Sequence, residues 1–400
     1  MGNNLPNKVL IIDSDSSVAA SITGRLKQTG VEVIVVTDLA SAQYRFNSEF
    51  FRVVFVSLNF PDLDGLSLIQ KWRGHEIKEK SLCSFVLLTA SSLRPDQTAL
   101  LNEIGRIFIH SRPLEFGATI KVMQQAYIAF LKATNTNKVK DVITETLEKG
   151  LISPEQALSK IIKEKDRLGE DYYTLAFDIY QQSDKWEEAL EFLETSPPEA
   201  INPLKKLNLM SKCYMNLGRW EEAKIALRTA EQKAPQHIER LNSLVDIYLN
   251  LKDPHNAIQR QKQILQSTSE EDQSIKFDMF QKLEAHGFDE HAQKLCQETT
   301  EPIEVVKHFN NMGVMYAKDD NLDSAIEDYK RALSYFPGNK DNYLIYYNLA
   351  LAFVKKKSPA FMKKAEEYLE VCLQLNPDYD KGEALLEKVQ KFLKSAKNSA

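Results

Sequence analysis

Short apolar runs and amphipathic stretches alternate through the first 134 residues of this 400-residue chain. The runs are Val9–Ile12, Val31–Val36, Val53–Val56, Phe85–Leu88 and Ile107–Ile109. Each run is rich in Val, Ile, Leu or Phe, and the stretches between them have helical spacing. Continuous apolar strands between helices are typical of a parallel sheet that is covered on both faces. The pattern therefore predicts a five-stranded parallel sheet in an α/β domain.

A different pattern, with a period of 34 residues, occupies about residues 170–377. Its clearest copy, Val306–Asn339, contains Phe309, Met312, Gly313, Tyr316, Ala325, Tyr329, Ala332 and Pro337. Small residues such as Gly313 and Ala325 allow two helices to approach closely, and Pro337 ends the second helix. About six copies follow one another in phase, which resembles the tetratricopeptide-repeat family. The resemblance implies an all-α solenoid of helical hairpins.

Polar residues and helix caps define the predicted domains. The stretch Lys132–Lys138 is the most polar one at a plausible boundary, so we place the end of the first domain there. Ser153 and Pro154 are expected to start a helix in a capping hairpin. The predicted parts are the sheet domain, a linker with the capping hairpin, the repeat array, and a capping helix with a tail, at residues 1–134, 135–169, 170–379 and 380–400.

The net charge of −5 is unevenly distributed along the chain. Residues 1–134 carry 14 basic and 12 acidic side chains, whereas residues 135–400 carry 37 basic and 44 acidic side chains. A solenoid that wrapped nucleic acid would need a basic groove, so we expect no DNA or RNA partner. The apolar runs are far shorter than the ~20 residues of a membrane helix, and the N-terminus has no signal-peptide pattern. We therefore expect a cytoplasmic protein without a membrane partner.

Polar residues follow the predicted strands, and the carboxyl ends of parallel strands meet at one edge of a sheet. In chain order these residues are Asp13, Ser14, Asp15, Ser57, Thr89 and Arg112. Ser57 also begins the pattern Ser57-x3-Pro61-x2-Asp64-Gly65, and Pro113 follows Arg112. The set is similar to the receiver domain of bacterial response regulators over about residues 7–133. The resemblance implies a flavodoxin-like α/β fold with a phosphoacceptor pocket at these strand ends.

The chain departs from the receiver pattern at four positions around this pocket. Ser57 stands where receivers have the phosphoacceptor Asp, and Ser14 replaces one residue of the acidic pair. Arg112 replaces a Lys, and Ile109 stands at the position of an aromatic switch. A Ser hydroxyl without an adjacent general base cannot attack phosphorus as a carboxylate does. We therefore expect a pseudo-receiver that has lost aspartyl phosphorylation.

The loss of one acidic ligand also argues against a metal, because Mg²⁺ prefers several hard oxygen ligands. We expect no cofactor, and no residual Mg²⁺ binding at Asp13 and Asp15. A purely structural interpretation of the pocket stays open. Asp13 and Asp15 could cap the first helix, Asp64-Gly65 could be a turn, and Thr89 and Arg112 could pair with Asp13.

The tetratricopeptide resemblance places certain positions of each first helix on the concave surface of the array. Those positions hold Lys205, Asn208, Lys212, Asn216, Asn242, Asn250, Lys307 and Asn310. Asn amides can hydrogen-bond the backbone of an extended peptide, and Lys can pair with a carboxylate. The alternative is that these residues are solvated helix faces. We expect them to form a groove for a protein or peptide partner.

Together these patterns predict a non-enzymatic, bacterial signalling adaptor of the two-component type. The array would hold the partner, and the receiver-like domain would dock or form a homodimer. No metalloprotease, nucleophile-elbow or P-loop motif is present in the sequence. Two alternatives stay open: a response regulator in which phosphorylation at Asp15 or Ser57 controls the array, and a chaperone-type cofactor that reads C-terminal peptides.

Overall fold

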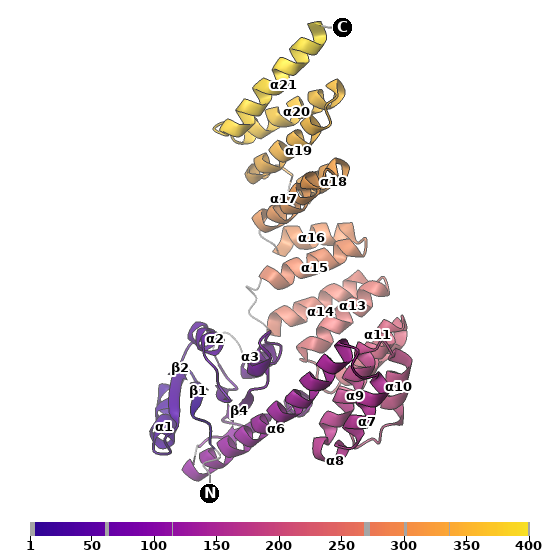
Figure 1. Cartoon of the computed structure of the whole chain (residues 1–400). Helices are drawn as coiled ribbons and strands as arrows, with labels where there is room; N and C mark the ends of the chain where they lie inside the picture. Colours follow the sequence, from indigo (N-terminus) through magenta and orange to yellow (C-terminus); the bar gives the residue numbers. More distant parts are fainter. Residues whose placement is uncertain are drawn as a thin grey trace. The chain divides into compact units, whose positions relative to one another are not determined.

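The computed structural model describes residues 5–60, 64–113, 115–267, 273–299, 302–335 and 337–398. The chain forms two compact units, Met1–Glu271 and Asp272–Ala400. Pro61 and the side chain of Phe309, which belong to the two sequence motifs, lie outside the described residues. The first unit contains the predicted sheet together with the first helical hairpins, and the second unit is helical (Figure 1).

A five-stranded parallel sheet begins the first unit, with the strand order β2-β1-β3-β4-β5. Its strands are β1 (Lys8–Ile12), β2 (Glu32–Val36), β3 (Val53–Ser57), β4 (Ser84–Thr89) and β5 (Ile107–Ser111). Every residue of β3 and β4 is buried, as expected for central strands with helices on both faces. The predicted flavodoxin-like α/β fold is therefore confirmed.

Helices cover the two faces of the sheet. They are α1 (Ser16–Lys27), α2 (Leu39–Ser48), α3 (Gly65–Arg73), α4 (Lys78–Ser81), α5 (Pro95–Ile104) and α6 (Phe116–Glu148). Successive side chains of a strand point to opposite faces. Val9 and Ile11 of β1 therefore join one apolar core with residues of α1 and α6, whereas Leu10 and Ile12 join a second core with residues of α2, α3 and α5.

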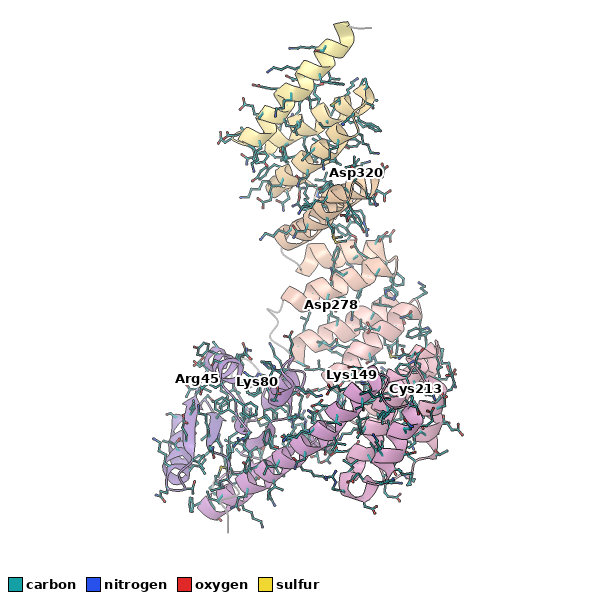
Figure 2. All side chains as sticks on the ribbon, in the orientation of Figure 1. Arg45, Lys80, Lys149, Cys213, Asp278 and Asp320 are labelled. Carbon is teal, nitrogen blue, oxygen red and sulfur yellow. The ribbon has the colours of Figure 1, made fainter. Side chains whose placement is uncertain are left out.

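Buried cations hold the loops on the second face in place. Arg73 of α3 donates hydrogen bonds to the carbonyl oxygens of Ser81 (2.8 Å) and Gly105 (3.0 Å), and burial lowers the pKa of its guanidinium to about 9. Lys80, labelled in Figure 2, is also buried and donates to the carbonyl oxygens of Phe46 and Asn47. The bonds of Arg73 fix the end of α5 relative to α3. Helix α5 is the element that contacts the helical hairpins, as described below.

Helix α6 is continuous over 33 residues, which corrects the predicted linker. The polar stretch Lys132–Lys138 is helical, and the expected boundary at residue 134 lies inside the helix. Thr and Asn are weak helix formers, but tertiary packing outweighs their low propensity. Ala133 is buried here, and Thr136 donates a hydrogen bond to Asp171 (3.2 Å). The sheet domain therefore continues into the helical region without an interruption (Figure 1).

Helical hairpins complete the first unit. The helices are α7 (Pro154–Ile162), α8 (Lys165–Leu168), α9 (Glu170–Gln182), α10 (Trp186–Thr195), α11 (Pro203–Asn216), α12 (Trp220–Glu231), α13 (Ile238–Asn250) and α14 (Pro254–Ser267). The predicted start of α7 is confirmed, because Ser153 caps the helix and Pro154 is its first residue. Helices α9 to α14 form three hairpins whose lengths match the 34-residue period.

The second unit repeats the same arrangement. Its helices are α15 (Gln273–Ala285), α16 (Asp289–Thr299), α17 (Pro302–Lys318), α18 (Leu322–Tyr335), the short 3₁₀ helix η1 (Lys340–Asn342), α19 (Tyr343–Lys355), α20 (Pro359–Leu375) and α21 (Asp380–Asn398). The predicted all-α solenoid is therefore confirmed. Within the described ranges, none of the helices combines the length and apolar character that a membrane span requires.

Gly313 has the close-packing role that the repeat pattern predicts for it. A Cβ atom at this position would lie 2.4 Å from Cε1 of Tyr329, whose ring is buried in the hairpin of α17 and α18. Such an approach is too close for two carbon atoms. The absence of a side chain at Gly313 therefore sets the distance between the two helices.

We predict that Gly313→Ala destabilises the second unit by about 1–3 kcal/mol, because the added methyl group overpacks the hairpin. Gly117→Ala is the matched control, since a Cβ atom at Gly117 would meet nothing within 4 Å. Thermal unfolding monitored by circular dichroism would compare the two variants. Equal melting temperatures for both would contradict the packing role of Gly313.

Candidate functional site

A small pocket of about 90 Å³ lies where the strand ends meet. It is lined by Asp13, Ser14, Asp15, Ser57, Asn59, Leu88, Ala90 and Arg112. The structure therefore brings together five of the six residues that the sequence predicts for this site. The sixth, Thr89, is buried beside the pocket, and its hydroxyl donates to the carbonyl oxygen of Ser91 (2.7 Å). Thr89 does not pair with Asp13, whereas Arg112 does.

The ion pair between Arg112 and Asp13 dominates the pocket. Nη2 of Arg112 lies 2.6 Å from Oδ2 of Asp13, a side chain with 1% exposure. Oδ1 of Asp13 accepts a hydrogen bond from the backbone N–H of Asp15 (3.0 Å). Nη1 of Arg112 also lies 3.7 Å from Oδ2 of Asp15. Both oxygens of the buried carboxylate are thus bonded to the chain itself.

Two other acidic residues of the motif cap helices. Oδ1 of Asp15 accepts hydrogen bonds from the backbone N–H (3.0 Å) and the hydroxyl (2.6 Å) of Ser17, in the first turn of α1. Asp64 is the N-cap of α3, because its Oδ1 accepts from the backbone N–H of Leu66 (2.8 Å). A carboxylate at this position satisfies backbone donors that a helix leaves unpaired. Asp15 therefore caps α1, as the structural interpretation of the pocket allows, and Asp64 caps α3.

Ser57 is buried at the end of β3, directly below the start of α3. A Cβ atom at Gly65 would lie 2.3 Å from the carbonyl oxygen of Ser57, so only glycine allows α3 to begin this close to the strand. The Ser57 hydroxyl is 3.4 Å from the carbonyl oxygen of Asn59. The partner of this hydroxyl is therefore a backbone carbonyl. Among the described residues, no imidazole or carboxylate bonds to the hydroxyl and could act as its base.

Mg²⁺, which the receiver resemblance implies, fits this residue set poorly. The Asp13 carboxylate already bonds to Arg112 and to the Asp15 backbone, and Ser14 supplies no carboxylate. The Asp15 carboxylate also lines the pocket, but it accepts hydrogen bonds from Ser17 and lies 3.7 Å from Arg112. A divalent cation would have to enter next to a guanidinium and displace it. In the part of the chain that the structure describes, no group of three or more His, Cys, Asp or Glu side chains could hold a metal ion.

The residues predicted for a peptide groove are divided between the two units. Lys205, Asn208, Lys212, Asn216, Asn242 and Asn250 belong to the first unit, and Lys307 and Asn310 belong to the second. Many of them bond to neighbours within their unit: Lys205 to Glu170, Lys212 to Glu239, Asn216 to the Lys212 carbonyl, Asn250 to the Asp246 carbonyl, and Asn310 to Asn348. Asn242 and Lys307 are exposed. A peptide groove at these positions stays a prediction.

Asn208 requires a correction, because it faces the receiver-like domain and not an open groove. Its Nδ2 donates a hydrogen bond to Oε1 of Glu103 in α5 (2.5 Å), and its Oδ1 accepts one from Nε of Arg240 (3.2 Å). The Nη2 of Arg240 also donates to Oε1 of Glu103, and the Glu103 and Arg240 side chains are both 1% exposed. His237 completes the cluster, with Nε2 3.5 Å from the same oxygen. Burial lowers the pKa of His237. We call Asn208, His237 and Arg240 the socket.

Sequence reasoning did not find Glu103, His237 or Arg240. A single Glu in an amphipathic helix is ordinary, and Arg240 lies 137 positions away from it in the chain. The family pattern places Asn208 on the concave surface, which was the only sequence signal for this contact. No local motif connects it to α5.

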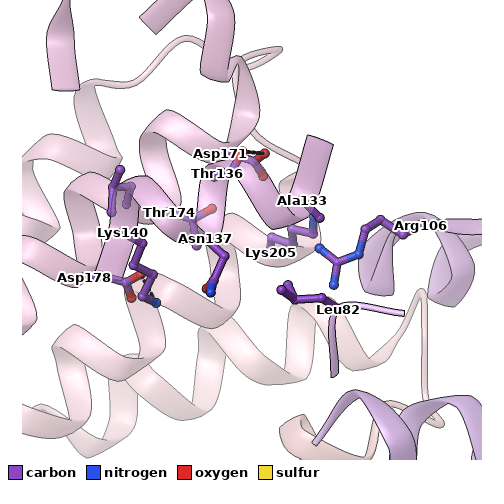
Figure 3. A pocket seen from close by; sticks show the side chains of 11 residues that line it. Leu82, Arg106, Ala133, Thr136, Asn137, Lys140, Asp171, Thr174, Asp178 and Lys205 are labelled. Carbon is purple, nitrogen blue, oxygen red and sulfur yellow. Dashed lines mark hydrogen bonds and ion pairs between the residues drawn. The ribbon is translucent and has the colours of Figure 1, made fainter. Parts of the chain in front are cut away.

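A cavity of about 240 Å³ lies beside this contact, between the receiver-like domain, α6 and α9. Figure 3 shows Arg106 on one side of it, with Lys140 and Asp178 on the other. Lys140 pairs with Asp178 (2.5 Å), and burial lowers the pKa of Arg106, which the negative charge of Asp171 partly opposes. The charged side chains that line the cavity are thus largely paired with one another. The cavity therefore has no evident preference for a charged ligand. It marks a loosely packed stretch along α6.

We predict that Arg112→Ala lowers the free energy of unfolding of the first unit by about 2–4 kcal/mol, because it leaves the buried Asp13 carboxylate without its cation. The control is Arg94→Ala, which removes an exposed partner of Asp96 and should cost less than about 1 kcal/mol. Urea denaturation would measure both. Equal effects would contradict the importance of the Asp13–Arg112 pair.

Comparisons with known proteins agree with both parts of the chain. The family model for the tetratricopeptide repeat matches residues 309–339. The virulence transcriptional regulatory protein PhoP of Salmonella choleraesuis (strain SC-B67) is 31% identical over 70 residues, which are 18% of this chain and 31% of that protein. The transcriptional regulatory protein PhoP of Escherichia coli (strain K12) is 26% identical over 95 residues, which are 24% of this chain and 41% of that protein. The chain thus spans less than half the length of these curated relatives.

Among solved structures, the chemotaxis protein CheY4 of Vibrio cholerae is 20% identical, with a TM-score of 0.27, and the match covers 30% of this chain and 97% of that one. The parallel sheet with its strand order, the pocket at the strand ends and the matched repeat lead to one conclusion. The chain joins a receiver-like domain at its N-terminus to a tetratricopeptide-repeat solenoid.

Proposed function

We propose that this chain is a non-enzymatic signalling adaptor in the bacterial cytoplasm. Its receiver-like domain would not accept a phosphoryl group, and its solenoid would bind a protein or peptide partner. The combination of a receiver-like domain with tetratricopeptide repeats indicates a role in signalling and protein interaction. The Asp13–Arg112 pair is the observation that carries the more specific proposal.

Aspartyl phosphorylation needs a carboxylate nucleophile and a cation that screens the incoming phosphoryl group. In this pocket the nucleophile position holds Ser57, whose hydroxyl bonds to a backbone carbonyl. The guanidinium of Arg112 neutralises the one buried carboxylate that could help to bind a metal. The 90 Å³ pocket thus has no carboxylate at the nucleophile position, and its buried carboxylate is paired with Arg112. We propose that the domain acts through its surface and needs no metal or other cofactor.

The partner surface is proposed on the solenoid. The acidic balance of residues 135–400 does not favour nucleic acid. Exposed groove residues such as Asn242 and Lys307 leave donors for a peptide backbone or a carboxylate. A homodimer through the receiver-like domain stays a prediction; Ile109 of β5 is 47% exposed and Phe116 of α6 is 42% exposed, so this edge has apolar surface to offer.

We predict that the full chain forms no adduct with acetyl phosphate or with beryllium fluoride in the presence of Mg²⁺. Intact-mass spectrometry would detect a phosphoryl adduct, and fluorine nuclear magnetic resonance would detect bound beryllium fluoride. The reason is that neither the nucleophile nor the metal ligands of the reaction are in place.

The matched control restores the receiver residues in the same chain by Ser14→Asp, Ser57→Asp and Arg112→Lys. Recovery of beryllium fluoride binding in this variant would show that the fold is competent and that the three side chains decide the chemistry. A stoichiometric adduct on the unaltered chain would contradict the proposed function and favour a phosphorylation-controlled regulator.

A further inference from the structure

The three socket residues belong to the solenoid, and two of the bonds of Arg240 stay within it. Nη1 of Arg240 donates to the carbonyl oxygen of Ala234 (2.6 Å), and Nε donates to Oδ1 of Asn208 (3.2 Å). These two bonds fix the guanidinium between α11 and α13. They leave Nη2 directed at the position that the Glu103 carboxylate takes. A buried guanidinium in this state requires an anion.

Glu103 meets this requirement incompletely. Asn208, Arg240 and His237 all approach the same oxygen, Oε1. The second oxygen, Oε2, is buried and has no hydrogen-bond partner. A carboxylate that is removed from water but bonded through one oxygen only keeps much of its desolvation cost. The contact thus places three side chains at one carboxylate oxygen and leaves Oε2 without a hydrogen bond to another described residue.

Apolar residues surround the socket. Leu204, Ala230 and Ala234 belong to the same apolar core as Leu100 and Leu101 of α5. Gln70 of α3 adds two polar bonds, from its Nε2 to the Gln236 carbonyl (3.1 Å) and from the Ile238 N–H to its Oε1 (2.9 Å). The solenoid surface under α5 thus combines a carboxylate site with an apolar patch. We call this surface the rim, and define it by Leu204, Asn208, Ala230, Ala234, His237 and Arg240.

Helix α6 offers a place where the two parts can separate. Its segment Ala133–Asn137 contains two Thr and two Asn residues, which favour helix less than most residues. The 240 Å³ cavity lies against Ala133, Thr136 and Asn137 (Figure 3). This turn of α6 borders the cavity and is held by the buried Ala133 and by the bond from Thr136 to Asp171. A bend at this turn would move the receiver-like domain away from the rim and would expose the part of the apolar core that the two share.

We propose that the rim is a binding surface for a partner protein, which the receiver-like domain keeps covered through Glu103. The partner it fits is an acidic helix that presents a carboxylate next to apolar side chains, as α5 does. This inference rests on the proposed function, because it assumes that the solenoid binds proteins. Beyond the proposed function, it states that the partner carries a carboxylate next to apolar side chains. It also states that the partner must displace the contact between Glu103 and Arg240.

The experiment places a reporter thiol under α5 in the full chain, by Ala234→Cys. Ala234 is fully buried, so labelling of this thiol by a soluble disulfide reagent requires that the rim is uncovered. The parent chain without this change gives the background from the native cysteines. Glu103→Gln is then added, and Glu79→Gln, at an exposed position of α4, is the matched control. Both replacements conserve size and remove one negative charge.

We expect Glu103→Gln to raise the labelling rate by about tenfold or more over the Glu79→Gln control, because a neutral amide cannot match the buried guanidinium. Equal rates in the two variants would overturn the proposal. Circular dichroism would show whether the Glu103→Gln variant has unfolded. In that case Glu103→Asp, which keeps the negative charge, is the second variant. The proposal requires that the thiol of the Glu103→Asp variant is labelled more slowly than that of the Glu103→Gln variant.

The partner chemistry is tested with a synthetic peptide of residues 94–106 as the probe. We expect this peptide to slow the labelling of the Glu103→Gln variant, and a peptide with Gln in place of Glu103 to slow it less. Equal protection by both peptides, or protection by neither, would overturn the carboxylate specificity. These measurements use no phosphoryl donor, so their failure is distinct from the formation of an adduct that would sink the proposed function.

Discussion

The buried pair of Glu103 and Arg240 is the charged contact between the receiver-like domain and the solenoid, inside an apolar core that the two share. A carboxylate and a guanidinium with 1% exposure each must be paired, and removal of either leaves a buried charge. The pair thereby fixes the register of α5 on α11 and α13. Both residues belong to the compact unit that extends to Glu271.

The phosphoacceptor pocket also contains a buried carboxylate that pairs with an arginine, but both residues belong to one domain. There Arg112 of the same domain forms the ion pair with Asp13 and neutralises the charge of this buried carboxylate. At the rim, the cation belongs to the solenoid and the anion belongs to the receiver-like domain. Arg112 thus pairs with a carboxylate of its own domain, whereas Arg240 pairs with a carboxylate of the other domain. Under the proposed function, the output of the receiver-like domain would depend on this contact surface and not on phosphoryl chemistry.

Much of the fold could be predicted because its signals are local. Val53–Val56 and Phe85–Leu88 are continuous apolar runs, and the convergence of parallel strand ends places Asp13, Ser57 and Arg112 in one pocket. Gly313 could be assigned a close helix contact from the repeat alone, and the structure places it against Tyr329.

The rest could not be predicted, because it depends on tertiary contacts. The low helix propensity of Thr134–Asn137 predicts a linker, whereas packing of Ala133 and the bond from Thr136 to Asp171 keep α6 helical. Glu103 and Arg240 are far apart in sequence and carry no motif. The family pattern could place Asn208 on the concave surface, but it could not reveal that α5 of the same chain lies there.

The most direct test of this account is a double-mutant cycle of Glu103→Gln and Arg240→Gln in the full chain. Hydrogen exchange of the Ile238 amide, which bonds to Gln70 across the contact, would measure the opening free energy in each variant. We expect a coupling energy of about 1.5 kcal/mol or more between the two positions, since each residue loses its main partner in either single variant. Additivity within about 0.5 kcal/mol would contradict a direct pair and, with it, the docking of the receiver-like domain on the rim.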